Sequence, residues 1–200
     1  MVARSTFVLP LGAFSEGRLP GRYTLEEWYE LNARRDEKFE YFDGFVVCMS
    51  GGSKDHATIT SNIHGALFAQ LSGKPCRARP ESQAIAVSAR QFRFADVSVA
   101  CPPQFVDIRG FDCLANPTVI VEVLSASTRE FDEGDKLADW LRIPSVRHVL
   151  LIEPDRPLVR HFTPGIADAR AHETLSMHIE LPEVGGTLTG RDIYLDASWR

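Results

Sequence analysis

The sequence predicts an α/β (α+β) fold, a single domain in which a mixed central β-sheet is flanked by helices and carries β-hairpins. Helical patterns alternate with β-prone runs along the chain, as in layered folds of this class. One run, residues 118–124, is β-branched and apolar on both faces, as expected of a central strand covered on both sides. The 200 residues, 44% hydrophobic and 24% charged, suit one globular domain.

The N-terminal elements follow from local signals. Residues 1–22 carry scattered Pro and Gly and predict an extended arm, which leaves 23–200 as the domain. Thr24 and Glu27 form a capping box that starts a helix ending near residue 32. The Asp-Gly pair at 43–44 separates two β-prone runs, which predicts a hairpin over residues 39–49.

A second helix begins after the glycines at 51–52, where Ser53 is placed to cap it, and its apolar residues recur at helical spacing from Ile59 to Leu71. We then expect strands at 76–79, 83–87, 97–101 and 118–124.

A third helix is predicted over roughly 129–141, ended by Pro144. A second hairpin follows around a turn at 153–157, with strands at 149–152 and 158–162. The turn-rich last forty residues predict short strands near 174–179 and 193–195.

Charge and composition exclude several classes of protein. With 22 basic and 27 acidic residues the net charge is −5, which argues against a generic polyanion binder but leaves room for a local basic groove. No apolar run approaches the roughly 20 residues that span a membrane. The four cysteines, at 48, 76, 101 and 113, lack zinc or redox spacing, so we expect reduced thiols in a cytoplasmic protein.

The most informative feature is Glu122, a single charge inside the apolar central strand. Burying a lone carboxylate costs several kcal/mol unless it is paired or binds metal. Asp96 stands at the start of another strand, and if the two strands are neighbours both carboxylates can converge on one Mg²⁺. The alternative is that Asp96 caps a turn and Glu122 pairs with an arginine.

Lys136 lies on the helix that follows the Glu122 strand, four residues after Asp132. From there it could orient a metal-bound water or stabilise charge on a phosphoryl group. The alternative is an ordinary solvated Asp–Lys pair. We expect Lys136→Ala to leave folding nearly intact, as a solvated helix position would allow.

These residues, taken in order, resemble the Uma-type putative restriction endonucleases of the PD-(D/E)XK nuclease superfamily. The resemblance runs from about Tyr23 to Tyr194 and rests on the following segments: Phe39-Glu40-Tyr41-Phe42-Asp43-Gly44, His56, Asp96-Val97-Ser98-Val99, Val121-Glu122-Val123-Leu124-Ser125, Asp132, Lys136 and Asp155-Arg156-Pro157.

The resemblance implies a restriction-endonuclease-like fold and a DNA endonuclease that uses Mg²⁺ or Mn²⁺, works as a homodimer and has no membrane segment. Asp96, Glu122 and the backbone carbonyl of Val123 would hold the metal, and Glu40 would hold metal or water. The superfamily's lysine position is occupied here by Leu124, which makes Lys136 the candidate for the lysine's role.

One departure concerns Phe45, which stands where the family often has an acidic residue and leaves Glu40 without a carboxylate helper beside the turn. The acidic net charge and Phe45 favour an alternative function, a catalytically silent nucleic-acid-binding or regulatory module. The intact set of Asp96, Glu122 and Lys136 favours the enzyme.

Substrate contacts are expected from His56, at a helix start, and from the arginines before Asp96. Arg77, Arg79 and Arg93 could line a phosphodiester groove, or they could be solvated arginines on edge strands.

Overall fold

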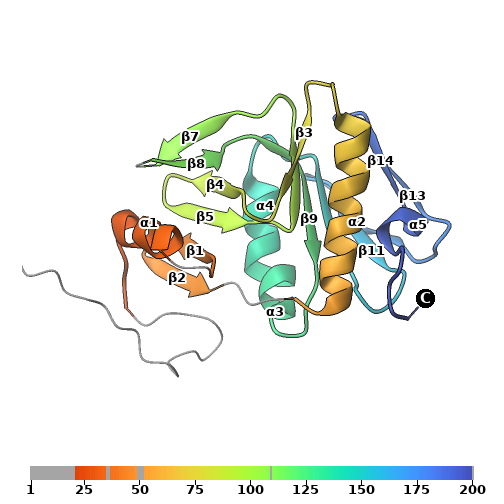
Figure 1. Cartoon of the computed structure of the whole chain (residues 1–200), viewed down its shortest axis with the longest axis horizontal. Coiled ribbons are helices and arrows are strands. Elements are labelled where there is room, and N and C mark those ends of the chain that lie inside the picture. The colour runs from red at the N-terminus through yellow and green to blue at the C-terminus, as the bar shows by residue number, and fades with distance from the viewer. Residues whose placement is uncertain (1–20, 35–36, 49–51, 109, 200) are drawn as a thin grey trace, which may run out of the picture.

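The fold is built on two six-stranded sheets joined side by side, with one helix on the first sheet and helices on both faces of the second (Figure 1). This computed structural model describes residues 21–34, 37–48, 52–108 and 110–199. The predicted arm, residues 1–22, lies outside them apart from its last two residues. The predicted fold class is confirmed, with two sheets in place of one.

The first sheet, sheet A, has the order β2-β1-β5-β4-β8-β7. Its strands are β1 (Phe39–Phe42), β2 (Phe45–Cys48), β4 (Ala84–Ser88), β5 (Gln91–Phe94), β7 (Phe105–Ile108) and β8 (Phe111–Leu114). The β1–β2 turn is the predicted Asp-Gly, and both Asp43 and Gly44 have positive φ, as a tight hairpin turn of this kind requires. Helix α1 (Leu25–Arg34) buries Trp28 against this sheet.

The second sheet, sheet B, has the order β12-β11-β10-β9-β6-β3. Its strands are β3 (Arg77–Pro80), β6 (Val97–Ala100), β9 (Pro117–Val123), β10 (His148–Ile152), β11 (Val159–Phe162) and β12 (Arg170–His172). Strands β9 and β10 are parallel, so the chain must cross over between them. The crossover is one continuous helical segment made of α3 (Arg129–Phe131), the π-helical turn η1 (Asp132–Lys136) and α4 (Leu137–Arg142).

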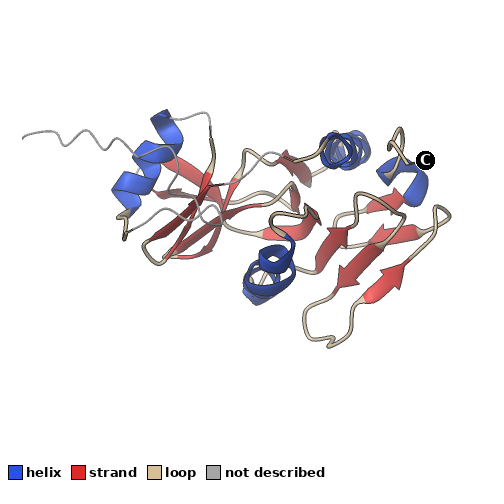
Figure 2. Ribbon diagram, turned by 90° about the horizontal axis from the view of Figure 1, so that it is seen from below, coloured by secondary structure: helices blue, strands red, loops and turns tan. Residues whose placement is uncertain are grey.

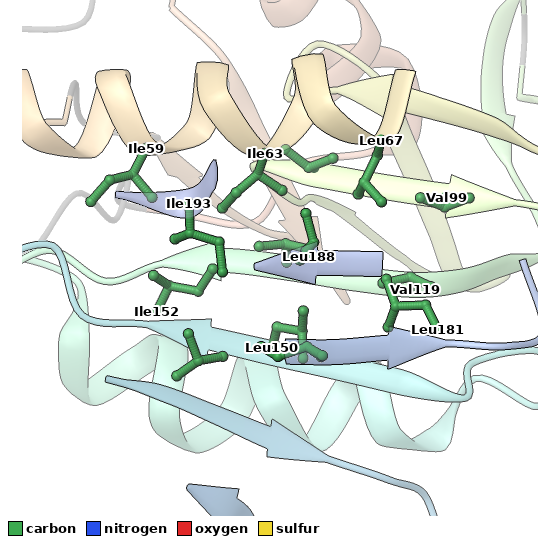
Figure 3. Packing of buried hydrophobic residues seen from close by; sticks show 14 of the residues in the cluster. Ile59, Ile63, Leu67, Val99, Val119, Leu150, Ile152, Leu181, Leu188 and Ile193 are labelled. Carbon is green, nitrogen blue, oxygen red and sulfur yellow. The ribbon is translucent and has the colours of Figure 1, made fainter. Parts of the chain in front are cut away.

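Sheet B separates two apolar layers. Helix α2 (Lys54–Leu71) covers one face with Ile59, Ile63 and Leu67, and the crossover helix covers the other (Figures 2 and 3). The ribbon of β13 (His178–Leu181) and β14 (Gly186–Thr189), with helix α5 (Gly190–Ile193), completes the layer on the α2 side. Because β9 is covered on both faces, its side chains from Val119 to Val123 are apolar in both directions except at Glu122.

Several predicted elements are confirmed and one is wrong. The first hairpin, the start of α2 after Ser53, the central strand and the β10–β11 hairpin are where the sequence predicts them. The strand predicted at 193–195 is wrong, because Ile193 ends α5 and packs in the core from a helical turn. Strands β5, β7 and β8 were not predicted, since their hairpins lack the Asn-Gly or Asp-Gly turn signal.

The expectation that all four cysteines are reduced is also corrected. Cys76 and Cys101 form a disulfide across the neighbouring strands β3 and β6, whose register pairs Arg77 with Ala100. Cys48 and Cys113 are free thiols. Within the described ranges, no helix is both long and apolar enough to cross a membrane.

Candidate active site

The candidate site is a pocket at the junction of the two sheets, where the N-terminus of α2, the end of β9 and the crossover helix meet. Four acidic side chains from four segments line it, together with one lysine and one histidine. The lining side chains discussed below are Glu40, His56, Asp96, Glu122, Thr128, Asp132 and Lys136. The sequence-predicted site residues Asp96, Glu122, Glu40, Lys136 and His56 are therefore brought together in one place.

Strand register puts Asp96 beside Glu122. Antiparallel β6 and β9 pair Val97 with Val121, so the next position brings Asp96 opposite Glu122. Both side chains lie on the sheet face that carries the crossover helix. Glu122 stands two residues from Ile120 and from Leu124, which pack on that face, and residues two apart in a strand share a face. The predicted convergence of Asp96 and Glu122 is confirmed. Asp96 Oδ2 accepts a hydrogen bond of 2.7 Å from the backbone N–H of Val123.

Lys136 is buried, and its ammonium lies among carboxylates. Its Nζ is 3.0 Å from Glu122 Oε1, 3.5 Å from Glu40 Oε1 and 3.8 Å from Asp132 Oδ1. Only 4% of Lys136 and 5% of Asp132 are exposed, so the alternative of a solvated pair is wrong. The solvated position on which the expectation for Lys136→Ala rests is wrong for the same reason, and we now expect alanine to leave buried negative charge without its counter-ion.

Glu122 is held by two donors from one helix. Lys136 donates to it, and Trp140 Nε1 donates to Oε1 at 2.8 Å. Burial raises the pKa of Glu122 well above its usual range, Lys136 opposes that rise, and the charges of Asp96 and Asp132 add to it. A raised pKa is what converging carboxylates predict, although burial, more than repulsion, causes it. The alternative in which Glu122 pairs with an arginine does not hold.

Asp132 is a residue of the pocket that the sequence pointed to only as a partner of Lys136. Its Oδ2 accepts a 2.6 Å hydrogen bond from the hydroxyl of Thr128. Burial raises the pKa of Asp132, the Lys136 charge and the Thr128 hydrogen bond lower it, and Glu40 and Asp96 raise it further. Trp140 was missed as well, although it stands four residues after Lys136, the spacing that shares one helix face.

His56 stands at the mouth of the pocket, in the first turn of α2. Its Nε2 is 3.3 Å from Asp96 Oδ2. Burial lowers the pKa of His56, but hydrogen bonding to Asp96, the charges of Asp96 and Asp132, and a hydrogen bond to the Val123 backbone outweigh it, so the net shift is upward. Gly52 makes room for the ring, because a Cβ there would overlap the imidazole.

Glu40 comes from β1 of sheet A and contacts both β5 of that sheet and Lys136 of the crossover helix. It accepts hydrogen bonds from Arg93 Nη1 and from the Phe94 N–H, both at 3.1 Å. Arg93 also holds Asp139 at 2.7 Å and is only 2% exposed. The substrate-binding prediction for Arg93 is therefore corrected, since a guanidinium enclosed between two carboxylates is not available to a phosphodiester.

Arg77 and Arg79 lie on β3, the edge strand of sheet B, and neither lines the pocket. The Arg77 guanidinium donates to backbone carbonyls of its own loop, and Arg79 lies over the Phe105 ring at 5.2 Å. The structure thus separates these arginines from the carboxylates that the sequence grouped with them.

The donor chemistry of the pocket fits a hard divalent cation such as Mg²⁺ or Mn²⁺. Carboxylate and carbonyl oxygens are the ligands such ions prefer, and the buried carboxylates here exceed the cationic groups that face them. Throughout the described residues, no three His, Cys, Asp or Glu side chains are already arranged to hold a metal ion. The reason is visible in the contacts, because Lys136 and His56 occupy the space beside Glu122 and Asp96.

The fold and the grouping of two carboxylates with a lysine are those of the restriction-endonuclease-like class. The chain belongs to the Uma2 family, described as "Putative restriction endonuclease", which it matches over residues 25–189. This match supports a nuclease.

Similar proteins include two from Synechocystis sp. The uncharacterized protein slr1290 is 34% identical over 128 residues, which cover 64% of this chain and just under two thirds (66%) of that protein. The uncharacterized protein sll1609 is 26% identical over 141 residues, 70% of this chain and 79% of that protein.

Among solved structures, a putative nuclease belonging to DUF820 from Anabaena variabilis has a similar fold. It superposes with a TM-score of 0.71 at 18% identity, over 88% of this chain and 98% of that chain.

Proposed function

We propose that this chain is a metal-dependent endonuclease that hydrolyses phosphodiester bonds of DNA. The observation that carries the proposal is that Asp96, Glu122 and Lys136, which come from three different segments, line one pocket. Family membership supports the same function. In this proposal Asp96, Glu122 and the carbonyl of Val123 hold Mg²⁺ or Mn²⁺, an ion that supplies Lewis acidity and a more acidic bound water.

The chain's own groups divide the remaining work. Lys136, unlike Arg93, lines the pocket, and in this proposal its ammonium beside Glu122 stabilises negative charge on a bound water or phosphate oxygen. Its pKa is raised, since burial lowers it but Glu122, Glu40 and Asp132 together raise it more. In this proposal Lys136 acts as an electrostatic donor that positions a water or a phosphate oxygen.

His56 is the group that can move a proton at the mouth of the pocket. Its contact with Asp96 orients the ring, and 18% exposure of the side chain leaves it open to a substrate. Glu40 and Asp132 complete the negative lining, and Thr128 fixes the orientation of Asp132. The homodimer and the cytoplasmic location remain predictions that accompany this proposal.

The test is nicking of supercoiled plasmid in the presence of Mg²⁺ or Mn²⁺. The wild type, Asp96→Asn, Glu122→Gln and the matched control Glu180→Gln, an exposed carboxylate on β13, are compared at equal concentration and purity. We expect activity in the wild type and the control and a loss of at least about 100-fold in the two site variants. Activity that persists in Asp96→Asn would identify a contaminating nuclease.

The alternative, a catalytically silent nucleic-acid-binding or regulatory module, is favoured by the position of Lys136, which already neutralises Glu122. It predicts DNA binding without nicking under either metal. A filter-binding or anisotropy measurement on the same four proteins separates the two functions.

A further inference from the structure

Three histidines form a row on sheet B, away from the candidate active site. Strand register places them, because Leu150 of β10 pairs with His161 of β11 and Val159 of β11 pairs with His172 of β12. His148 stands two residues before Leu150 and so projects from the same face of the sheet. This is the face that the β13–β14 ribbon covers, since Leu150 and Val159 pack with residues of that ribbon.

The rings are in direct contact. His148 Nδ1 lies 2.8 Å from His161 Nε2, and the centroids of the two rings are 5.0 Å apart. The ring of His172 stacks on that of His161 with centroids 6.0 Å apart. His172 Nε2 is buried without a hydrogen-bond partner, which is costly for an imidazole nitrogen that nothing satisfies.

A carboxylate orients the first ring of the row. Glu183, in the turn between β13 and β14, has its Oε2 2.5 Å from His148 Nε2. The carboxylate accepts the Nε2–H, which leaves Nδ1 of His148 facing His161 Nε2. A carboxylate that holds one ring nitrogen while the other faces the ion is the arrangement that metal-binding histidines adopt.

We propose that His148 Nδ1, His161 Nε2 and His172 Nε2 bind a divalent transition metal of the imidazole-preferring class, such as zinc, with Glu183 holding His148 in place. Three neutral imidazoles suit zinc, cobalt or nickel and disfavour Mg²⁺, which prefers oxygen. The proposed ion is therefore chemically distinct from the one in the carboxylate pocket, and the inference does not rest on nuclease activity.

Binding requires the hydrogen between His148 Nδ1 and His161 Nε2 to leave that contact, by release to solvent or by transfer to the other nitrogen of His161, and it requires two movements. In the part of the chain that the structure describes, three potential ligands do not yet converge at metal-binding distance. At nitrogen–metal distances of about 2.0–2.1 Å in tetrahedral geometry, two ligand nitrogens stand roughly 3.3 Å apart, so the 2.8 Å pair has to open by about half an ångström. His172 Nε2, which is buried without a hydrogen-bond partner, has to reach the same ion. The positive charge of Arg170 acts on both His161 and His172 and disfavours a bound cation, whereas the carboxylate of Glu183 favours one.

The experiment is a calorimetric titration of untagged, chelator-treated protein with ZnCl₂ at pH 7.5 in 10 mM MgCl₂, which keeps the carboxylate pocket supplied with its own class of ion. A parallel titration with CoCl₂ follows the visible absorption of tetrahedral cobalt. We expect one equivalent of each metal. His161→Phe and His172→Phe should abolish binding, and Glu183→Ala should weaken it by roughly 10- to 100-fold.

The matched control is His178→Phe, which removes an exposed histidine of β13 outside the row and should bind as the wild type does. Circular dichroism and thermal melting of each variant check that it is folded. His161 and His172 are half-buried, so phenylalanine can be accommodated there more readily than at the buried His148. Absence of a zinc equivalent in the wild type, or zinc binding unchanged in folded His161→Phe, would overturn the proposal and leave a purely hydrogen-bonded row of imidazoles.

Discussion

The buried ammonium of Lys136 makes a stability prediction that the solvated-pair alternative does not make. Lys136→Met keeps the length of the side chain and removes its charge. The change leaves Glu122, which is 3% exposed, and Glu40, which is 2% exposed, without the ammonium that lies 3.0 Å and 3.5 Å from them. The carboxylates then face one another in a site with little access to water.

The expected loss follows from the class of interaction. Removing one partner of a buried ion pair costs about 3–5 kcal/mol, because the remaining charge is left uncompensated. With a urea slope of about 2 kcal/mol/M, the denaturation midpoint should fall by roughly 1.5–2.5 M. Since the pKa of Glu122 is already raised, the variant can recover part of the loss by taking up a proton. The deficit should therefore shrink as the pH is lowered.

The assay is urea denaturation at pH 7, followed by tryptophan fluorescence and circular dichroism. Lys54→Met, a change at an exposed lysine in the first turn of α2, is the matched control and should stay within about 0.5 kcal/mol of the wild type. The double variant Lys136→Met/Glu122→Gln removes both charges and should regain a large part of the loss. A Lys136→Met protein within 1 kcal/mol of the wild type would refute the buried counter-ion.

Three further predictions test other contacts. Gly52→Ala should push the His56 ring off Asp96, so the raised pKa of His56 should fall back toward its ordinary value in an NMR titration; an unchanged pKa would contradict the contact. Cys76→Ser removes a disulfide between residues 25 apart and should lower the free energy of unfolding by roughly 3–4 kcal/mol in urea denaturation. An unchanged free energy of unfolding in the oxidised protein would show that this disulfide does not form. Burial, followed by the charges of nearby groups, lowers the pKa of His161 to about 4, so unfolding takes up a proton and the free energy of unfolding should fall as the pH drops from 6.5 to 4; in chelator, His161→Gln should show a shallower fall than the wild type.

The sequence was informative where a signal is local. The Asp-Gly turn and the capping Ser53 fix their elements within a few residues, so both could be predicted without knowledge of the rest of the chain. Glu122 could be singled out because a charge inside an apolar strand is costly to bury unless it is paired or binds a metal ion. Its convergence with Asp96 was predicted only on the condition that the two strands are neighbours, and the register of β6 and β9 shows that they are.

What could not be predicted depends on which face of an element meets which neighbour. The sequence suggests that Arg93 is exposed, yet its guanidinium lies between the carboxylates of Glu40 and Asp139. For Lys136 the sequence left a site lysine and a solvated Asp–Lys pair both open, and the burial of the crossover helix against the face of β9 that carries Glu122 decides between them. Burial of this kind is set by packing between elements distant in the sequence, and composition and periodicity carry no signal for it.

The pocket departs from what stability alone would select. A buried ion pair such as that of Glu122 and Lys136 is often no more stabilising than well-packed apolar residues of similar volume. Ile120 of β9 and Leu124 just after it lie on the same face as Glu122 and are apolar, so an apolar residue is compatible with its position. Elsewhere along β9 the side chains suit a strand buried between two layers, and the exception is Glu122, which faces Asp96, Lys136 and the pocket. A residue that conflicts with the packing around it is expected where a protein has a functional site. In the proposed function, the reason for the charge is metal binding by the Glu122 carboxylate.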